Sequence, residues 1–83
     1  MKIEATIKNL IVEVLTDVKV SDLHDDKELI GDIGLDELDL VEIMLNLESE
    51  LNIEIDDRDY ERCKTVGDLV DMVKRLIEDK EGQ

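Results

Sequence analysis

Residues 32–51 read DIGLDELDLVEIMLNLESEL, a short approach containing glycine followed by a long amphipathic stretch. Asp36 is a favourable helix N-cap, and Glu37 and Asp39 place negative charge in the first turn, where the helix dipole favours it. Neither proline nor glycine interrupts the stretch before Asn52, a residue that often closes a helix. The pattern therefore predicts a helix that begins after Asp36 and ends at about Leu51.

The two faces of this helix differ in polarity. At 100° per residue the polar side chains share one arc: Asp39, Glu42, Asn46, Ser49 and Glu50. Apolar side chains cover most of the remaining circumference: Leu38, Leu40, Val41, Ile43, Met44, Leu45, Leu47 and Leu51. An apolar arc this broad predicts the most enclosed helix of the fold, in contact with other helices on two sides. Glu48 falls within that arc, so we expect it in a gap between those partners, reaching solvent.

The residues before this stretch predict a second helix and a long loop. Apolar side chains recur at helical spacing over residues 2–18: Ile3, Ile7, Leu10, Ile11, Val14, Leu15 and Val18. Residues 19–36 lose this period and contain Ser, Asp and Gly. A loop of this length in a compact domain is often functional or held by its own side chains. We expect Leu29, Ile30 and Ile33 to hold it to the core.

The residues after Asn52 predict a linker and two further helices. Ile53 and Ile55 alternate with polar residues, which alone is typical of a strand, but no second strand exists to pair with it. We therefore expect an extended linker and a short helix over residues 57–63. Thr65 and Asp68 have the spacing of a capping box, with Asp in place of the usual Glu, and predict the start of a final helix. We expect this helix to end at about residue 79 and to be followed by a frayed tail over residues 81–83. These elements predict one all-α domain, residues 1–83: a small four-helix bundle of three longer helices and one short helix.

The composition excludes several classes of partner. The chain has 24 acidic against 10 basic residues, a net charge of −14. Such a charge repels nucleic acid and anionic membranes, so we expect neither as a partner and predict a monomer. No apolar run reaches the ~18–20 residues needed to cross a bilayer. The start carries acid and helical periodicity, unlike a signal peptide, which predicts a cytoplasmic protein or one whose targeting segment has been removed.

Few side chains could support catalysis or metal binding. The single Cys63 and the single His24 exclude an internal disulfide and a cysteine-based zinc site. We expect Cys63 to be a small buried side chain and His24 to lie on the surface. The carboxylates of Asp36, Glu37 and Asp39 are clustered, but the EF-hand pattern is absent, so weak and non-specific ion binding is the expectation. The sequence therefore predicts neither an enzyme nor a metal site.

The segment DIGLDEL, residues 32–38, resembles the D-x-G-x-D-S-L signature of the acyl carrier proteins of fatty acid and polyketide synthesis. Asp32, Gly34, Asp36 and Leu38 match this signature, while Glu37 stands at the serine position. The resemblance extends over nearly the whole chain, including the acidic helix, the LNIEI segment that follows it, and TVGDLV at the start of the last helix. It implies a small helical bundle that carries acyl chains.

The resemblance also implies a cofactor, a pocket and a partner surface. In the family the serine carries 4′-phosphopantetheine, whose thiol holds the acyl chain as a thioester. The implied aliphatic pocket is lined by Leu38, Val41, Met44, Leu45, Ile55, Leu69 and Val70. The implied docking surface for synthases and transferases with basic patches consists of Asp36, Asp39, Glu42, Glu48 and Glu54. Glu37 has no hydroxyl, and Ser21 and Ser49 lie outside the motif, so this chain is expected to carry no cofactor.

Two functional hypotheses follow from this resemblance. The first is an acyl carrier protein whose attachment serine is replaced by Glu37, so that this chain stays unmodified. The second is an acyl-carrier-like interaction or regulatory module that docks basic partners through its acidic central helix. The sequence does not choose between them.

Overall fold

The computed structural model describes residues 3–81, and the helices in this range follow the predicted order. They are α1 (Ile3–Val14), α2 (Glu37–Leu51), α3 (Asp57–Arg62) and α4 (Val66–Glu81), with a 3₁₀ turn, η1 (Val20–Asp22), after α1. The described residues form no strand beyond an isolated bridge between Glu28 and Thr65. The prediction of an all-α bundle with three longer helices and one short helix is confirmed.

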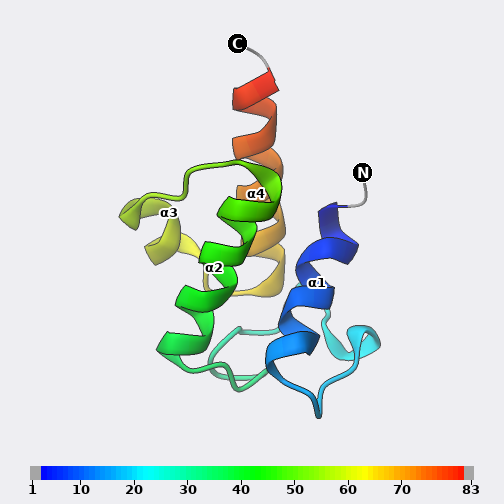
Figure 1. Cartoon of the computed structure of the whole chain (residues 1–83). Helices are drawn as coiled ribbons and strands as arrows, with labels where there is room; N and C mark the ends of the chain where they lie inside the picture. Colours follow the sequence, from blue (N-terminus) through cyan, green and yellow to red (C-terminus); the bar gives the residue numbers. More distant parts are fainter. Residues whose placement is uncertain (1–2, 82–83) are drawn as a thin grey trace.

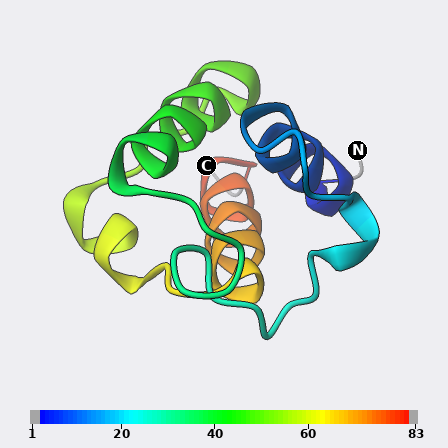
Figure 2. The ribbon, with the colours of Figure 1, turned by 90° about the horizontal axis from the view of Figure 1, so that it is seen from below.

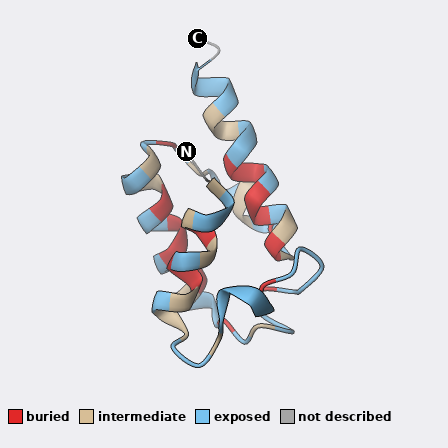
Figure 3. Cartoon of the chain, turned by 90° about the vertical axis from the view of Figure 1, so that its right-hand side faces the viewer, coloured by how far each residue is buried: buried red, intermediate tan, exposed pale blue. Residues whose placement is uncertain are grey.

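Three helices surround the core and the fourth lies at its side. In Figures 1 and 2, α2 lies between α1 and the short α3, and α4 runs behind them. The core is aliphatic, as predicted, with fully buried side chains such as Ile7, Ile43 and Leu69. Figure 3 shows the buried residues mostly on the sides of the helices that face one another, whereas the last turn of α4 is exposed.

The first helix is shorter than predicted. α1 ends at Val14 and not at Val18, and Lys2, its predicted first residue, lies outside the described residues. Leu15 still donates its backbone N–H to the carbonyl of Ile11 at 2.9 Å, after which the chain turns. Leu15 and Val18 nevertheless pack against the core from this turn. The helical spacing of apolar residues therefore extends beyond the end of α1 in the sequence, because both side chains are still partly buried.

The long loop is held by two of its three predicted residues, Leu29 and Ile33, and by two further leucines. Leu29 is buried, but Ile33 is only partly buried and Ile30 is 56% exposed, so the expectation for Ile30 is wrong. Leu23 and Leu35 supply the other buried anchors. Backbone hydrogen bonds add to these contacts: the N–H of Leu29 donates to the carbonyl of Lys64 at 2.8 Å. The loop is thus joined to the start of α4, a long-range pairing that the apolar pattern does not contain.

The same loop approaches the start of α4 very closely at Gly67. The Gly67 N–H donates to the carbonyl of Asp25 at 2.9 Å, and a Cβ at this position would lie 3.1 Å from that oxygen. A side chain here would push the loop away from α4, so the glycine allows the two backbones to meet.

The central helix begins and ends as predicted but is less enclosed. Asn52 closes it in the left-handed conformation, with φ 53°. Leu38, Val41 and Leu45 are 79%, 41% and 59% exposed. The prediction that α2 is the most enclosed helix is therefore wrong: α1 and α3 flank it, but neither covers this outward strip.

The remaining elements agree with their predictions in most respects. Ile53 is buried and Ile55 partly buried, so the linker after α2 fills the core without forming a strand. Thr65 and Asp68 form the predicted capping box, in which the Asp68 N–H donates to Thr65 Oγ1 at 3.1 Å and the Thr65 N–H to Asp68 Oδ2 at 3.1 Å. α4 continues to Glu81, two residues past the predicted end at residue 79, and the rest of the predicted tail lies outside the described residues.

Candidate functional site at the start of the second helix

Reciprocal hydrogen bonds fix the first turn of α2. Asp36 Oδ1 accepts the Asp39 N–H at 2.7 Å, and Asp39 Oδ2 accepts the Asp36 N–H at 3.2 Å. Glu37 is the first residue of the helix and is exposed. Its carboxylate therefore lies at the end of α2 where unpaired N–H groups and the helix dipole favour a negative charge.

The loop before Asp36 holds this turn in place. Asp32 Oδ2 accepts the Glu28 N–H at 2.8 Å, which closes the loop on itself. Gly34 has φ 94°, a conformation that side chains disfavour. Leu35 is buried, and its N–H donates to the carbonyl of Leu29 at 3.0 Å. Asp32, Gly34 and Asp36 thus have local structural roles. Together they hold the loop in the conformation that places residue 37 at the start of α2.

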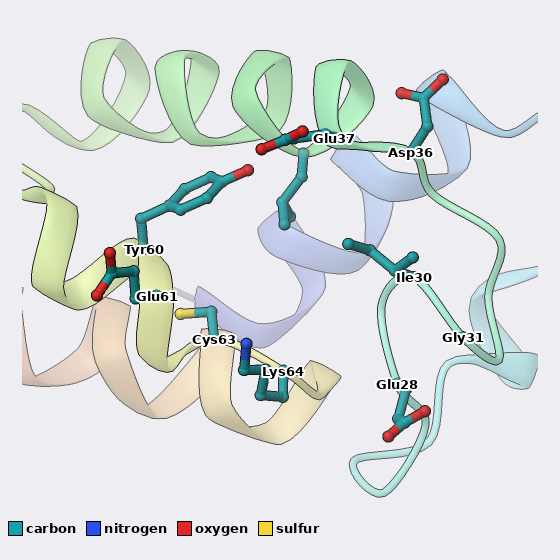
Figure 4. A pocket seen from close by; sticks show the side chains of 10 residues that line it. Glu28, Ile30, Gly31, Asp36, Glu37, Tyr60, Glu61, Cys63 and Lys64 are labelled. Carbon is teal, nitrogen blue, oxygen red and sulfur yellow. The ribbon is translucent and has the colours of Figure 1, made fainter.

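A pocket of about 610 Å³ lies directly beside Glu37, between the start of α2, the loop and α3. Figure 4 shows its side chains. Its floor is formed by the buried Leu40 and Cys63. Around them lie apolar, acidic and basic groups: Ile30, Gly31, Tyr60, Glu28, Asp36, Glu37, Glu61 and Lys64. The pocket has an apolar base and a predominantly acidic rim.

Most residues of this pocket, such as Leu40, Tyr60 and Lys64, were not predicted from the sequence as site residues, and Tyr60 is the aromatic one among them. Figure 4 shows its ring reaching from α3 toward Glu37, with the hydroxyl on the Glu37 side. Burial raises the pKa of the Tyr60 phenol, and the negative charge of Glu37 raises it further. Its signal in the sequence is that it is the only aromatic residue of the chain.

A second pocket, of about 300 Å³, lies between α2, the linker and α3, and Glu37 and Tyr60 line it as well. Four of the predicted acyl-pocket residues line it: Val41, Met44, Leu45 and Ile55. The other three line neither pocket. Leu69 and Val70 are buried in the core, and Leu38 is exposed to solvent.

The predicted docking residues fall into two groups. Asp36, Glu42 and Glu54 are exposed, whereas Asp39 and Glu48 are half-buried. Three of these carboxylates accept backbone hydrogen bonds: Asp36 and Asp39 accept each other's N–H, and Glu48 Oε2 accepts that of Ile55 at 2.9 Å. Asp39 therefore stabilises the start of α2, and Glu48 ties the linker to its last turns.

Cys63 is poorly suited to nucleophilic chemistry. It is buried, as predicted, and its Sγ donates to Met72 Sδ at 3.5 Å. Burial raises the pKa of the Cys63 thiol to about 11, and the nearby carboxylates of Asp68 and Asp59 act in the same direction. His24 lies on the surface, as expected. Within residues 3–81, no group of three or more His, Cys, Asp or Glu residues is arranged to hold a metal ion.

Among the described residues, none of the helices has the length and apolar character needed to cross a membrane.

Comparison with known proteins identifies the family. The model of the phosphopantetheine attachment site family matches residues 5–73. The acyl carrier protein of Desulforapulum autotrophicum is 36% identical over 75 residues, which cover 90% of this chain and 97% of the relative. That of Thermotoga maritima is 38% identical over 76 residues, covering 92% and 93%.

A solved structure supports the same assignment. A protein described as a candidate acyl carrier protein from Mycobacterium tuberculosis superimposes with a TM-score of 0.79 at 32% identity, covering 88% of this chain and 96% of that one. Acyl carrier proteins act in fatty acid biosynthesis as carriers, not catalysts, and interact with synthase and transferase enzymes. By fold, by sequence and by the loop that presents residue 37, this chain belongs to the acyl carrier protein family.

Proposed function

We propose that this chain is an acyl carrier protein whose attachment position is occupied by Glu37 and which therefore stays unmodified. The observation that carries the proposal is the place of Glu37: it is the first residue of α2, directly after the D-x-G-x-D loop and beside the larger pocket. In the family this is the place of the serine that holds 4′-phosphopantetheine.

The side chain at this position does not fit that cofactor. A phosphodiester tether requires a hydroxyl, and Glu37 offers a carboxylate, whose acyl phosphate would be too labile to serve as a tether. Ser21 lies in the 3₁₀ turn η1, and Ser49 lies near the end of α2, so neither stands at the start of a long helix. The chain as written is therefore expected to carry no prosthetic group.

The surface of α2 supports a docking function that does not need the cofactor. The exposed Leu38, Val41 and Leu45 lie on the same helix as the exposed carboxylate of Glu42 and at most four residues from it. A partner with an apolar patch inside a basic rim would match this combination. Charge would accelerate the encounter, and the small apolar strip would allow the complex to separate readily.

A second candidate function rests on the charge of Glu37. A carboxylate at the start of α2 places a negative charge where the family carries a phosphodiester, so the unmodified chain would resemble the modified protein to a partner enzyme. This favours an interaction or regulatory module that docks the same enzymes without delivering an acyl group. The basic patches of those enzymes, the monomeric state, the single domain over residues 1–83 and the cytoplasmic location remain predictions from the sequence.

Conversion of residue 37 to serine tests the proposal. The chain as written and its Glu37→Ser variant are incubated with coenzyme A and a phosphopantetheinyl transferase, and each intact protein is weighed. We expect modification of the variant alone. Modification of the unaltered chain would contradict the proposal, because Ser21, Ser49 or another group would then be the acceptor.

A well-folded Glu37→Ser protein that stays unmodified would favour the second candidate function. In that case the surface that the transferase recognises has diverged from that of an acyl carrier protein. Circular dichroism and a cooperative thermal melt establish that the variant is folded.

A further inference from the structure

Two pockets meet at the same two residues. Glu37 and Tyr60 line both the larger pocket, whose floor is Leu40 and Cys63, and the smaller pocket, which contains Met44. The ring of Tyr60 projects from α3 toward Glu37 at the start of α2 (Figure 4). Because the same aromatic side chain lines both pockets, its flat and rigid ring stands at the boundary that they share.

We propose that the Tyr60 ring is a dividing wall that limits the length of the aliphatic chain this protein holds. A linear chain that enters beside Glu37 fills one of the two pockets and stops at the ring. Without the ring the two pockets join, and a longer chain can be buried from solvent along its whole length. The inference rests on the proposed function: because this chain is expected to carry no prosthetic group, the guest would be a free linear aliphatic chain, and the limit on its length is assigned to one residue.

The rim of the larger pocket restricts the charge of the guest. Four carboxylates, those of Glu28, Asp36, Glu37 and Glu61, line the pocket together with one ammonium group, that of Lys64. A free fatty acid would bring a further negative charge into this field, whereas an uncharged chain end would not. The structure therefore favours linear aliphatic chains without a negative head group.

The test uses the unmodified chain and a series of 1-alkanols from four to ten carbons. Binding is followed by NMR through the ¹³C-methyl signals of Leu40, in the larger pocket, and Met44, in the smaller one. Each methylene that leaves water contributes about 0.8 kcal/mol, an increase of about fourfold in affinity. We expect this increase to stop at a certain chain length, which marks the point where the guest meets the ring.

Two substitutions separate the ring from its hydroxyl. Tyr60→Phe keeps the ring, so the increase should stop at the same length as in the unaltered chain. Tyr60→Ala removes the ring, so short alkanols should bind no more tightly, while the increase should continue for at least two more methylenes. The longest alkanol would then bind at least about fifteenfold more tightly than it binds the unaltered chain.

A matched control accounts for general loosening of the core. Val12 is partly buried against the core and lines neither pocket. Val12→Ala should lower stability and leave the limiting length unchanged. If Tyr60→Ala fails to melt cooperatively, Tyr60→Leu takes its place. Leucine keeps apolar atoms next to the backbone but is shorter than the ring of tyrosine.

The outcomes separate this inference from the proposed function. The same limiting length in all variants, or a Tyr60→Phe protein that behaves like Tyr60→Ala, would overturn the role of the ring. Decanoate that binds as tightly as 1-decanol at neutral pH and low salt would overturn the role of the acidic rim. Failure of the Glu37→Ser protein to accept phosphopantetheine would count against the proposed function alone, because the alkanol titration requires no modification.

Discussion

Two leucines of α2 provide a direct test of how this helix is placed. Leu45 and Leu47 are only two residues apart, and the amphipathic pattern assigns both to the apolar arc. In the structure Leu47 is fully buried, whereas Leu45 is 59% exposed and lines the smaller pocket. Truncation of each to alanine should therefore have very different consequences.

The expected magnitudes follow from burial. Leu47→Ala removes atoms that are enclosed on all sides and leaves a cavity, which costs about 2–5 kcal/mol of unfolding free energy. Leu45→Ala removes atoms that are mostly in water, so its cost should stay below about 1 kcal/mol. For a domain of this size each kcal/mol lowers the melting temperature by about 4–8 °C, so Leu47→Ala should melt at least about 8 °C lower than the unaltered chain.

Urea unfolding followed by circular dichroism measures both costs, with the slope of the transition compared among the three proteins. The pocket gives a second readout, because Leu45→Ala should weaken binding of 1-decanol while leaving the protein nearly as stable. Equal losses of stability in the two variants would refute the reasoning, since they would mean that the outward strip of α2 is buried.

Four further predictions concern charge and protonation. Burial raises the pKa of the Cys63 thiol to about 11, so only about one thiol in a thousand is ionised at pH 8. Iodoacetamide should therefore alkylate Cys63 far more slowly in the folded chain than in the urea-unfolded chain. Equal alkylation rates would contradict a buried thiol. The Asp59 N–H that donates to Asp56 holds the pKa of that carboxyl below its usual range, so its stabilising effect is present above the unfolded pKa of about 3.9 and is lost as the pH falls further. In thermal melts, the melting temperature of Asp56→Asn should therefore fall less than that of the unaltered chain as the pH is lowered below about 4. The net charge of −14 predicts that sodium chloride or magnesium raises the melting temperature at neutral pH, and a midpoint that does not move would argue against self-repulsion. At low salt, Glu37→Gln should lose about 0.3–1 kcal/mol of stability through the helix dipole, and equal midpoints for the two proteins would exclude this effect.

Several features of the fold followed from the sequence because the interactions that create them are local. The Asp36–Asp39 and Thr65–Asp68 pairs lie three residues apart, so their side chains reach each other's backbone N–H groups as soon as the helix starts. Asn52 ended α2 where its own backbone preference predicted. The loop motif before Glu37 is similarly local, and the start of the candidate site was therefore readable from residues 32–38.

The local sequence pattern did not predict the structure correctly where an apolar side chain can be buried from more than one backbone conformation. Leu15 and Val18 continued the helical period, yet they pack from a turn, because the core accepts an apolar side chain from either conformation. Ile30 is as apolar as its neighbour Leu29, but Leu29, whose N–H donates to the carbonyl of Lys64, is buried, whereas Ile30 is exposed beside the pocket.

The sequence by itself determined the helices, their caps, the aliphatic core and the acidic position at the start of α2. The tertiary structure alone decided that Leu38, Val41 and Leu45 face outward and that Tyr60, from a helix of six residues, reaches Glu37. The physical reason is range: caps and periodicity depend on neighbours within one turn, whereas exposure and the meeting of Tyr60 with Glu37 depend on how separate helices are placed in space.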